Sequence, residues 1–159
     1  MDADLMQLES SVNRMAHLLT RNRRAEYMKF RARVGLDRAA MAVLRQLDEG
    51  GPTRPGELAA VLRVESPHIT RQLQLLERRG YATRVPDPED RRAQLADLTD
   101  AGHAAAARLR TASREAMGEA LAGWSARDIR VLGRLLGRMV DDFEAHDEQT
   151  DLVEQASTA

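Results

Sequence analysis

Closely spaced glycine and proline residues divide positions 50–102 into short segments, and this division constrains the fold more than any other feature of the chain. The run Gly50-Gly51-Pro52 ends one helical pattern, and Pro55 favours the start of a short helix that includes Leu58 and Leu62. Ser66-Pro67 has the residue types of an N-cap and a first helical position, so a further helix is predicted from there to Gly80. Two short helices joined by a tight turn are therefore expected.

A β-hairpin is predicted directly after these two helices. Residues 81–85 and 93–98 have the composition of strands, and the segment between them begins with Pro-Asp-Pro-Glu-Asp at 86–90, a turn sequence. The order helix, helix, hairpin over residues 53–98 is that of a winged helix-turn-helix. In that arrangement the second helix fits the major groove of DNA, and the hairpin, or wing, reaches an adjacent groove or the backbone.

The helix predicted over residues 66–78 has two different faces. At 100° per residue, Ile69, Leu73 and Leu76 share the side that would anchor the helix in a core. The opposite side, with its flanks, carries Pro67, His68, Thr70, Arg71, Gln74 and Arg78. Arg and Gln side chains can form paired hydrogen bonds with guanine and adenine edges. The same pattern also suits an ordinary amphipathic helix with a solvated polar face.

The predicted wing carries basic and acidic side chains together. Arg84, Arg91 and Arg92 lie around Asp87, Glu89 and Asp90. An arginine at a hairpin tip can enter the minor groove, above all where that groove is narrow. Mixed charges on an exposed hairpin also favour solubility without any DNA contact, so the wing residues alone leave both interpretations open.

Helical patterns flank this segment on both sides. Apolar residues at steps of three and four from Leu5 to Leu19 predict one amphipathic helix that runs to about Phe30, and Asp37 can cap the next helix. After the hairpin, an Ala-rich helix is predicted from Thr99 or Asp100 to about Gly123. Ser125 and Asp128 then form a capping box that starts a last helix. The apolar stripe of that helix runs from Ile129 to Phe143.

Charge separates the C-terminal segment from the rest of the chain. Residues 141–159 contain seven Asp and Glu and no Lys or Arg, so they carry −7 and leave +6 on residues 1–140. A basic body with an acidic tail fits a nucleic-acid partner, and it fits many other proteins as well. We therefore predict a winged-helix domain at 35–98, a helical region formed by 1–34 and 99–146, and a flexible acidic tail at 147–159.

Several classes of function are disfavoured by what the sequence lacks. The chain has no cysteine, which excludes disulfides, thiolate metal sites and thiol-based sensing. Its four histidines are scattered, and there is no metalloprotease or serine-nucleophile motif, so no enzymatic activity, metal or cofactor is expected. Without a signal peptide or an apolar run of membrane-spanning length, the protein is expected to be soluble and cytoplasmic, with no membrane partner.

Residues 56–102 read GELAAVLRVESPHITRQLQLLERRGYATRVPDPEDRRAQLADLTDAG, and this segment closely resembles the MarR (multiple antibiotic resistance regulator) family. The resemblance rests on Glu-Leu-Ala, Ser-Pro-x-x-Thr-Arg, Leu-Glu-Arg-Arg-Gly, the wing Pro-Asp-Pro-Glu-Asp-Arg-Arg and Leu-Thr-x-x-Gly. Each motif is weak alone, but their order is highly specific. The flanking helices extend the resemblance to roughly residues 5–145.

The resemblance implies a mainly α fold, in which a winged helix-turn-helix is flanked by N- and C-terminal dimerisation helices. It implies a bacterial homodimer whose apolar stripes form the interface, through Leu5, Leu8, Val12, Ile129, Leu132, Leu136, Met139, Val140 and Phe143. From the sequence alone, the core of a monomer would be the default for these residues. The stripes, however, exceed what one small winged domain can cover.

The resemblance also assigns roles to individual residues. Arg92 matches the wing arginine that enters the minor groove, and Asp90 matches the acid that orients it. The DNA-binding positions are then Ser66, Pro67, His68, Thr70, Arg71, Gln74, Arg84, Asp90, Arg91 and Arg92. Thr70 and Arg84 also match positions near the small-molecule crevice of the family. Because no cysteine stands in the first helix, an aromatic or phenolic effector would bind non-covalently.

These implications predict a sequence-specific regulator of transcription that binds double-stranded DNA. It would act as a dimer on a pseudo-palindromic operator. Repression is the commoner role in the family, so a repressor is expected, and a small-molecule effector would relieve the repression. The alternative is a winged-helix module that binds another protein and has no specific DNA site. Arg71 and the Arg91-Arg92 pair favour DNA, since a protein-binding module would not need outward arginines at its wing tip.

Overall fold

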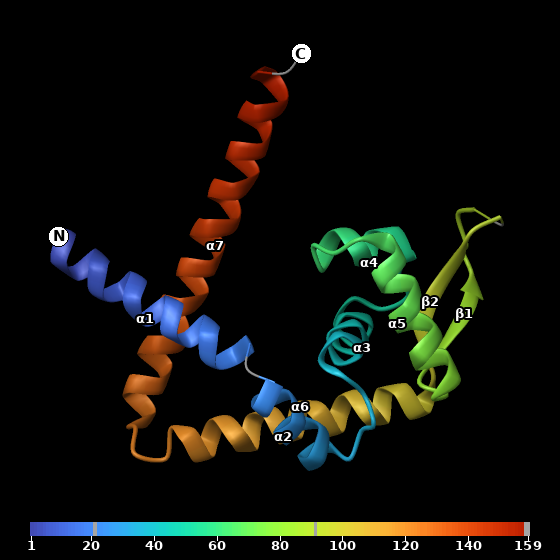
Figure 1. Cartoon of the computed structure of the whole chain (residues 1–159), viewed down its shortest axis with the longest axis horizontal. Helices are drawn as coiled ribbons and strands as arrows, with labels where there is room; N and C mark the ends of the chain where they lie inside the picture. Colours follow the sequence, from blue (N-terminus) through green and yellow to red (C-terminus); the bar gives the residue numbers. More distant parts are fainter. Residues whose placement is uncertain (21, 91, 158–159) are drawn as a thin grey trace. The chain divides into compact units, whose positions relative to one another are not determined.

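The computed structural model describes residues 1–20, 22–90 and 92–157, with the backbone alone at 20, 22–25 and 147–157. It divides into two compact units, Met1–Ala116 and Met117–Ala159, which are described separately. The first unit contains α1 (Asp2–Thr20), α2 (Asn22–Ala32), α3 (Arg38–Gly50), α4 (Pro55–Val61), α5 (Ser66–Arg78), the hairpin β1 (Ala82–Pro86) and β2 (Gln94–Leu98), and most of α6 (Asp100–Ala120). The second contains the end of α6 and α7 (Ala126–Ser157) (Figure 1).

The core of the first unit lies where α3, α5, the hairpin and α6 meet. Contacts join α3 to α5, α4 to α5, α3 to β2 and α5 to β1. The largest fully buried side chains are apolar: Val34, Leu36, Val43, Leu44, Leu47, Leu58, Ile69, Leu73 and Leu76. Small residues of α6, among them Ala105 and Ala106, complete this core and allow the helix to approach closely. Burial of this apolar set is the main stabilising contribution to the unit.

Local sequence signals explain where α3 begins and ends. The carboxylate of Asp37 accepts a hydrogen bond from the Ala40 N–H at 2.8 Å, as an N-cap does. Gly51 has a φ of 74°, a left-handed conformation that favours glycine, and its N–H donates to the Leu47 carbonyl. Both boundaries confirm the sequence prediction, and they lead the chain into α4.

The hairpin is antiparallel, with a register that runs from Ala82 opposite Leu98 to Pro86 opposite Gln94. A third segment joins it from outside the hairpin. Thr53, just before α4, donates its N–H to the Ala96 carbonyl at 3.0 Å and accepts from the Ala96 N–H at 2.9 Å. The base of the wing is therefore tied by backbone hydrogen bonds to the start of the helix-turn-helix.

The junction between α5, the hairpin and α6 is closed by one side chain. The Thr99 hydroxyl donates to the Gly80 carbonyl at 2.6 Å and accepts from the Gly102 N–H at 3.1 Å. The Thr99 N–H also donates to the Tyr81 carbonyl at 3.1 Å. Thr99 thus caps α6 and holds the end of α5, which gives a physical reason for the Leu-Thr-x-x-Gly motif.

Several predicted boundaries differ from the observed ones by a few residues. The N-cap of α5 is Glu65 and not Ser66, because the Glu65 carbonyl accepts the first helical bond, from the His68 N–H at 2.9 Å. α6 ends at Ala120 and not at about Gly123. The predicted first helix is described as α1 and α2, on either side of residue 21, which lies outside the described residues.

In the second unit, α7 begins as the sequence predicted. The Ser125 hydroxyl accepts from the Asp128 N–H at 3.1 Å and donates to the Asp128 carboxylate at 2.6 Å, so Ser125 caps α7. The backbone of α7 is helical to Ser157, whereas the sequence predicted a frayed tail from Asp147. The flexibility of residues 147–159 stays a prediction, as does the grouping of 1–34 with 99–146. Among the described residues, no helix is long and apolar enough to cross a membrane.

Candidate nucleic-acid interface

α5 has the two faces that the sequence predicted. Ile69, Leu73 and Leu76 are at most 1% exposed and fix the helix in the core. Most of the predicted DNA-binding positions on this helix are exposed: Ser66, Pro67, Thr70, Arg71 and Gln74. His68 is half-buried, and the Thr70 hydroxyl donates to the Ser66 carbonyl at 3.1 Å, within its own helix. The helix therefore presents an ordered polar surface opposite a rigid apolar anchor.

The wing is attached to α5 through an ion pair. Arg84 of β1 donates from Nε to the Glu77 carboxylate of α5 at 2.6 Å, and both side chains are about one-third exposed. Arg84 was expected among the DNA-binding residues and near the effector crevice. The structure shows its guanidinium engaged with the last turn of α5, which orients the first strand of the wing relative to that helix.

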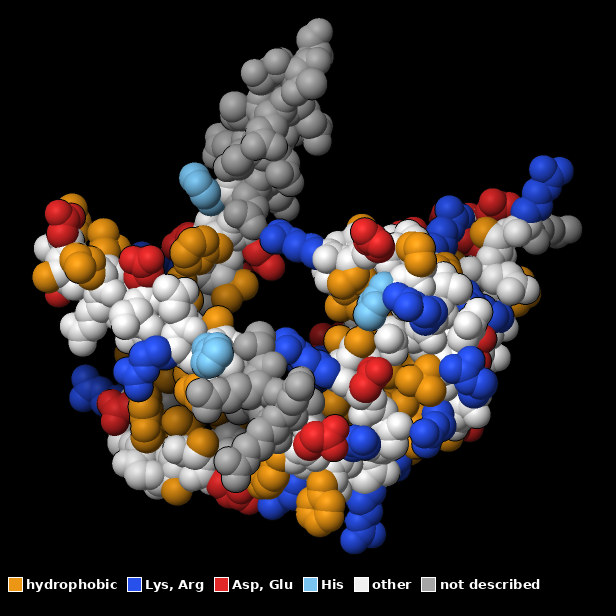
Figure 2. All heavy atoms as spheres, in the orientation of Figure 1, with side chains coloured by type: hydrophobic (Ala, Val, Ile, Leu, Met, Phe, Trp, Pro, Cys, Tyr) orange, Lys and Arg blue, Asp and Glu red, His pale blue; other side chains and the backbone are white. Residues whose placement is uncertain are grey.

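The wing tip is organised by hydrogen bonds that backbone N–H groups donate to carboxylates. Asp90 accepts from the Arg92 N–H at 3.0 Å, so it holds the backbone of the residue whose side chain it was expected to orient. Arg92 is exposed, and Arg91 lies outside the described residues. Figure 2 shows basic side chains over the visible face of the winged domain, one of them projecting at the hairpin tip. The predicted DNA contacts of these three residues stay predictions.

Sequence reasoning missed the residue that anchors the wing loop. Asp87, which follows β1, is 5% exposed and is the one buried charged residue among those the structure describes. One of its carboxylate oxygens accepts from the Glu89 N–H at 2.8 Å and, more weakly, from the Asp90 N–H at 3.4 Å. The other accepts from Arg54 Nε at 2.7 Å and from a terminal guanidinium nitrogen of Arg54 at 2.6 Å.

These contacts favour the ionised form of both side chains. The Glu89 N–H, together with the guanidinium of Arg54, lowers the pKa of Asp87 from its ordinary value of 3.8, although burial acts in the opposite direction. The hydrogen bond and charge of Asp87 raise the pKa of Arg54. The turn sequence Pro86-Asp87-Pro88 was a signal that the Asp87 side chain would cap its own loop. No sequence signal connected it to Arg54, 33 residues earlier.

The first unit contains further charged contacts, which involve α6. Asp48 of α3 is paired with Arg110 and lies 3.3 Å from His103 Nδ1, both on α6. Arg31 of α2 pairs with Glu115 of α6 at 2.8 Å. These pairs join α6 to the preceding helices. No group of three or more His, Asp or Glu side chains in the described part of the chain could hold a metal ion.

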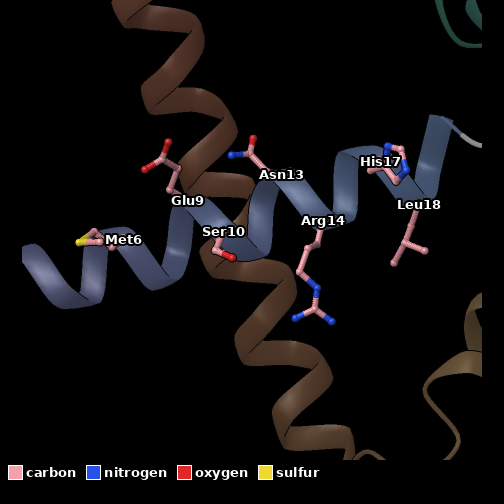
Figure 3. Close-up of a pocket in the computed structure, with 7 residues that line it drawn as sticks. All are labelled: Met6, Glu9, Ser10, Asn13, Arg14, His17 and Leu18. Carbon is pink, nitrogen blue, oxygen red and sulfur yellow. The ribbon is translucent and has the colours of Figure 1, made fainter.

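A hollow of about 730 Å³ lies beside α1. The residues that line it all belong to this one helix: Met6, Glu9, Ser10, Asn13, Arg14, His17 and Leu18 (Figure 3). Their side chains point to different sides of the helix in Figure 3, and no other described element contributes to the lining. The hollow therefore lacks the convergent polar groups of a ligand site.

The apolar stripes are solvent-exposed within each unit. In α1, Leu5 is 58% exposed, and Leu8 and Val12 are exposed as well. In α7, Phe143 is 61% exposed, Ile129, Leu136 and Val140 are exposed, and Leu132 and Met139 are half-buried. Continuous apolar surfaces of this kind commonly mark protein contacts.

Comparisons with known proteins agree with this architecture. The family model described as "MarR family" matches residues 34–93. The uncharacterized HTH-type transcriptional regulator YxaD of Bacillus subtilis is 34% identical over 141 residues, which cover 87% of this chain and 99% of that protein. The solved structure of a MarR family protein from Bacillus stearothermophilus covers 91% of this chain and 98% of its own, with a TM-score of 0.79 and 19% identity.

A structure described as the Multiple Antibiotic Resistance Repressor, MarR, is also similar, with a TM-score of 0.65 and 24% identity over 80% of this chain and 93% of that one. These likenesses confirm the predicted mainly helical fold with a two-stranded wing and flanking helices. The family consists of DNA-binding transcription regulators and not of enzymes, as the sequence indicated. The chain therefore belongs to the MarR family of winged helix-turn-helix transcriptional regulators.

Proposed function

We propose that this regulator is a homodimeric repressor that recognises a pseudo-palindromic operator in double-stranded DNA. The observation that carries the proposal is the outer face of α5, where Arg71 and Gln74 are exposed directly opposite the buried Leu73 and Leu76. A rigid helix with such a face, next to a wing, suits insertion into the major groove while the wing tip follows the minor groove.

The exposed stripes of α1 and α7 support the dimer. Side chains such as Leu5, Leu136 and Phe143 leave water when two copies associate, which favours association in proportion to the apolar area buried. A two-fold dimer demands two-fold symmetry in its operator, with half-sites about one helical turn apart. A footprint on one asymmetric half-site bound by one subunit would contradict this.

The surroundings of Arg84 support a non-covalent effector site. The Arg84 side chain is 29% exposed, and its guanidinium already binds the Glu77 carboxylate. An aromatic or phenolic acid could compete with Glu77 for this guanidinium, with Thr70 as a second polar contact. Salicylate is therefore expected to release the protein from its operator, and Arg84→Gln is expected to weaken that response.

The experiment that tests the proposal is footprinting on the DNA upstream of the protein's own gene, followed by binding to operator variants at several salt concentrations. Arg71→Ala should cost about 1–3 kcal/mol and relax the preference at one base pair of each half-site, if Arg71 contacts a base edge. Arg92→Ala should weaken binding to all sequences, because minor-groove contacts respond mainly to shape and potential. Asp90→Ala should have a smaller effect of the same kind.

Arg45→Ala serves as the control, since Arg45 is an exposed arginine of α3, outside α5 and the hairpin. It should change operator binding little. If Arg92→Ala keeps full affinity in a folded dimer, the wing does not contact DNA. If wild-type protein shows no protected site and no affinity that falls with added salt, the alternative of a protein-binding winged-helix module is favoured instead.

A further inference from the structure

The Asp87 carboxylate anchors the wing loop internally, and it is also tied to a distant part of the chain. The Asp87 carboxylate divides its two oxygens between two tasks. One closes the loop through the N–H groups of Glu89 and Asp90, and the other binds the Arg54 guanidinium through two nitrogens. A buried carboxylate needs such partners, because an unpaired charge at this position would be strongly destabilising.

Arg54 is itself fixed from both sides. The preceding Thr53 forms two backbone hydrogen bonds with Ala96 of β2, at 3.0 and 2.9 Å. The following Pro55 begins α4, and the Arg54 carbonyl accepts the first helical bond, from the Leu58 N–H at 3.0 Å. The backbone of Arg54 can therefore move little relative to the helix-turn-helix, so Arg54 gives the wing loop an attachment point on that motif.

We propose that Arg54 and Asp87 are positioning residues that set the place of the wing tip relative to α4 and α5, and so the placement of Arg92 on DNA. The part that concerns DNA rests on the function proposed above. The structural part does not, because the contacts are present in the protein alone. Arg84–Glu77 holds the first strand of the wing to α5, whereas Arg54–Asp87 holds its tip loop.

A competing role for Arg54 is a direct contact with a DNA phosphate, since its side chain is 41% exposed. The two roles predict different behaviour for two substitutions. Lysine keeps the charge for a phosphate, but it cannot reproduce the two-nitrogen contact with Asp87. Asp87→Asn keeps an oxygen that can accept from the Glu89 N–H, but it removes the carboxylate that Arg54 binds. A positioning role therefore makes both substitutions harmful, and a phosphate role makes neither harmful.

The structural test is limited trypsin digestion of the full-length protein without DNA, with the rate of cleavage after the wing arginines 91 and 92 measured by mass spectrometry. Arg54 itself precedes proline and resists trypsin. Arg54→Ala, Arg54→Lys and Asp87→Asn should each raise this rate by about tenfold, as expected for a lost hydrogen bond to a charged group. The double variant Arg54→Ala/Asp87→Asn should be cleaved no faster than the faster of the two single variants, because the two substitutions remove the same interaction. Arg45→Ala is the control, and circular dichroism verifies that each variant is folded.

The DNA test is hydroxyl-radical footprinting of the same proteins on the operator. The three single variants should lose minor-groove protection under the wings while protection at the α5 sites persists. Unchanged wing cleavage in Arg54→Ala and Asp87→Asn would overturn the proposal. Weaker DNA binding in Arg54→Ala with normal binding in Arg54→Lys and Asp87→Asn would also overturn it, in favour of a phosphate contact. Faster wing cleavage in a protein that binds no DNA would uphold the positioning role and refute the proposed function.

Discussion

Gly102 is the third residue of α6, and it passes so close to the backbone of Tyr81 that no larger residue fits there. A Cβ atom at this position would overlap the Tyr81 carbonyl oxygen, lie 3.0 Å from its carbonyl carbon and 3.2 Å from Leu98 Cβ. Ordinary contact begins at 3.4 Å, so the helix must move at least 0.4 Å from the carbon and further from the oxygen. The two Tyr81 atoms belong to the backbone and cannot turn aside as the end of a side chain would, and the Tyr81 oxygen is also held by the Thr99 N–H.

The size of the effect follows from these contacts. Overpacking costs about 1–3 kcal/mol, and the upper end applies because backbone must shift. Separating Tyr81 from Thr99 loses a further hydrogen bond worth about 1 kcal/mol. Replacing glycine inside a helix returns up to about 1 kcal/mol. We therefore expect Gly102→Ala to lower the free energy of unfolding by about 3 kcal/mol.

Urea denaturation followed by circular dichroism, at one fixed protein concentration, measures this change. With an m-value of about 2 kcal/mol/M, the midpoint should fall by about 1.5 M. Gly118→Ala is the matched control in the same helix, since a Cβ at Gly118 meets no atom within 4 Å. This control should be neutral or slightly stabilising. A midpoint for Gly102→Ala equal to that of wild type, at an unchanged m-value, would refute the assigned contact.

Three further outcomes are expected. Leu136→Glu or Leu132→Glu should dissociate or unfold the proposed dimer, because a buried unpaired charge is costly. Sedimentation that shows a folded wild-type monomer at micromolar concentration would contradict the interface. Removal of residues 147–159 should leave the operator footprint unchanged, and a lost footprint with an intact dimer would show that the acidic tail has a direct role. Asp87 has a lowered pKa, so its contribution to the free energy of unfolding is present above pH 3.8 and is lost as the pH falls through the pKa of the folded state. The stability difference between wild type and Asp87→Asn should therefore shrink in acid, which denaturation at pH 7, 5 and 3 would measure.

The sequence predicted the elements whose signals are local. Asp37 caps α3 and Gly51 ends it, and both signals stand next to the helix in the sequence. The two faces of α5 follow from the helical period of about 3.6 residues alone. The start of α5 was predicted one residue late, because Ser66 has the preferred N-cap composition while the backbone turns at Glu65. Composition at a helix end identifies a region, and the hydrogen bonds decide the residue.

Contacts between distant residues could not be predicted in the same way. Arg54 is one of 23 arginines, and nothing in its neighbourhood of the chain distinguishes it as the partner of Asp87. The hydrogen bond from Thr99 to Gly80 spans 19 residues, and it forms because the hairpin brings both ends of the wing together. The residue types at 80 and 99 do not reveal this pairing. The resemblance to a family pointed to Thr99 and Gly102 as a motif, but only the structure explains the motif by a hydrogen bond and a close approach.

The attachments of the wing differ in how accessible they are, and this difference bears on the effector site proposed at Arg84. The base of the wing is held by backbone and hydroxyl bonds at Gly80 and Thr99, which no charged ligand displaces readily. The tip loop is held by the Asp87 carboxylate, which is 5% exposed and keeps its hydrogen bonds from the Glu89 and Asp90 N–H groups even when an anion competes for Arg54. The pair between them, Arg84 and Glu77, is about one-third exposed on both sides, so an anionic ligand has access to it. An effector acting there would loosen the first strand of the wing against α5 while both other attachments persist. Its effect on DNA binding should therefore be a change in wing placement and not the unfolding of the domain.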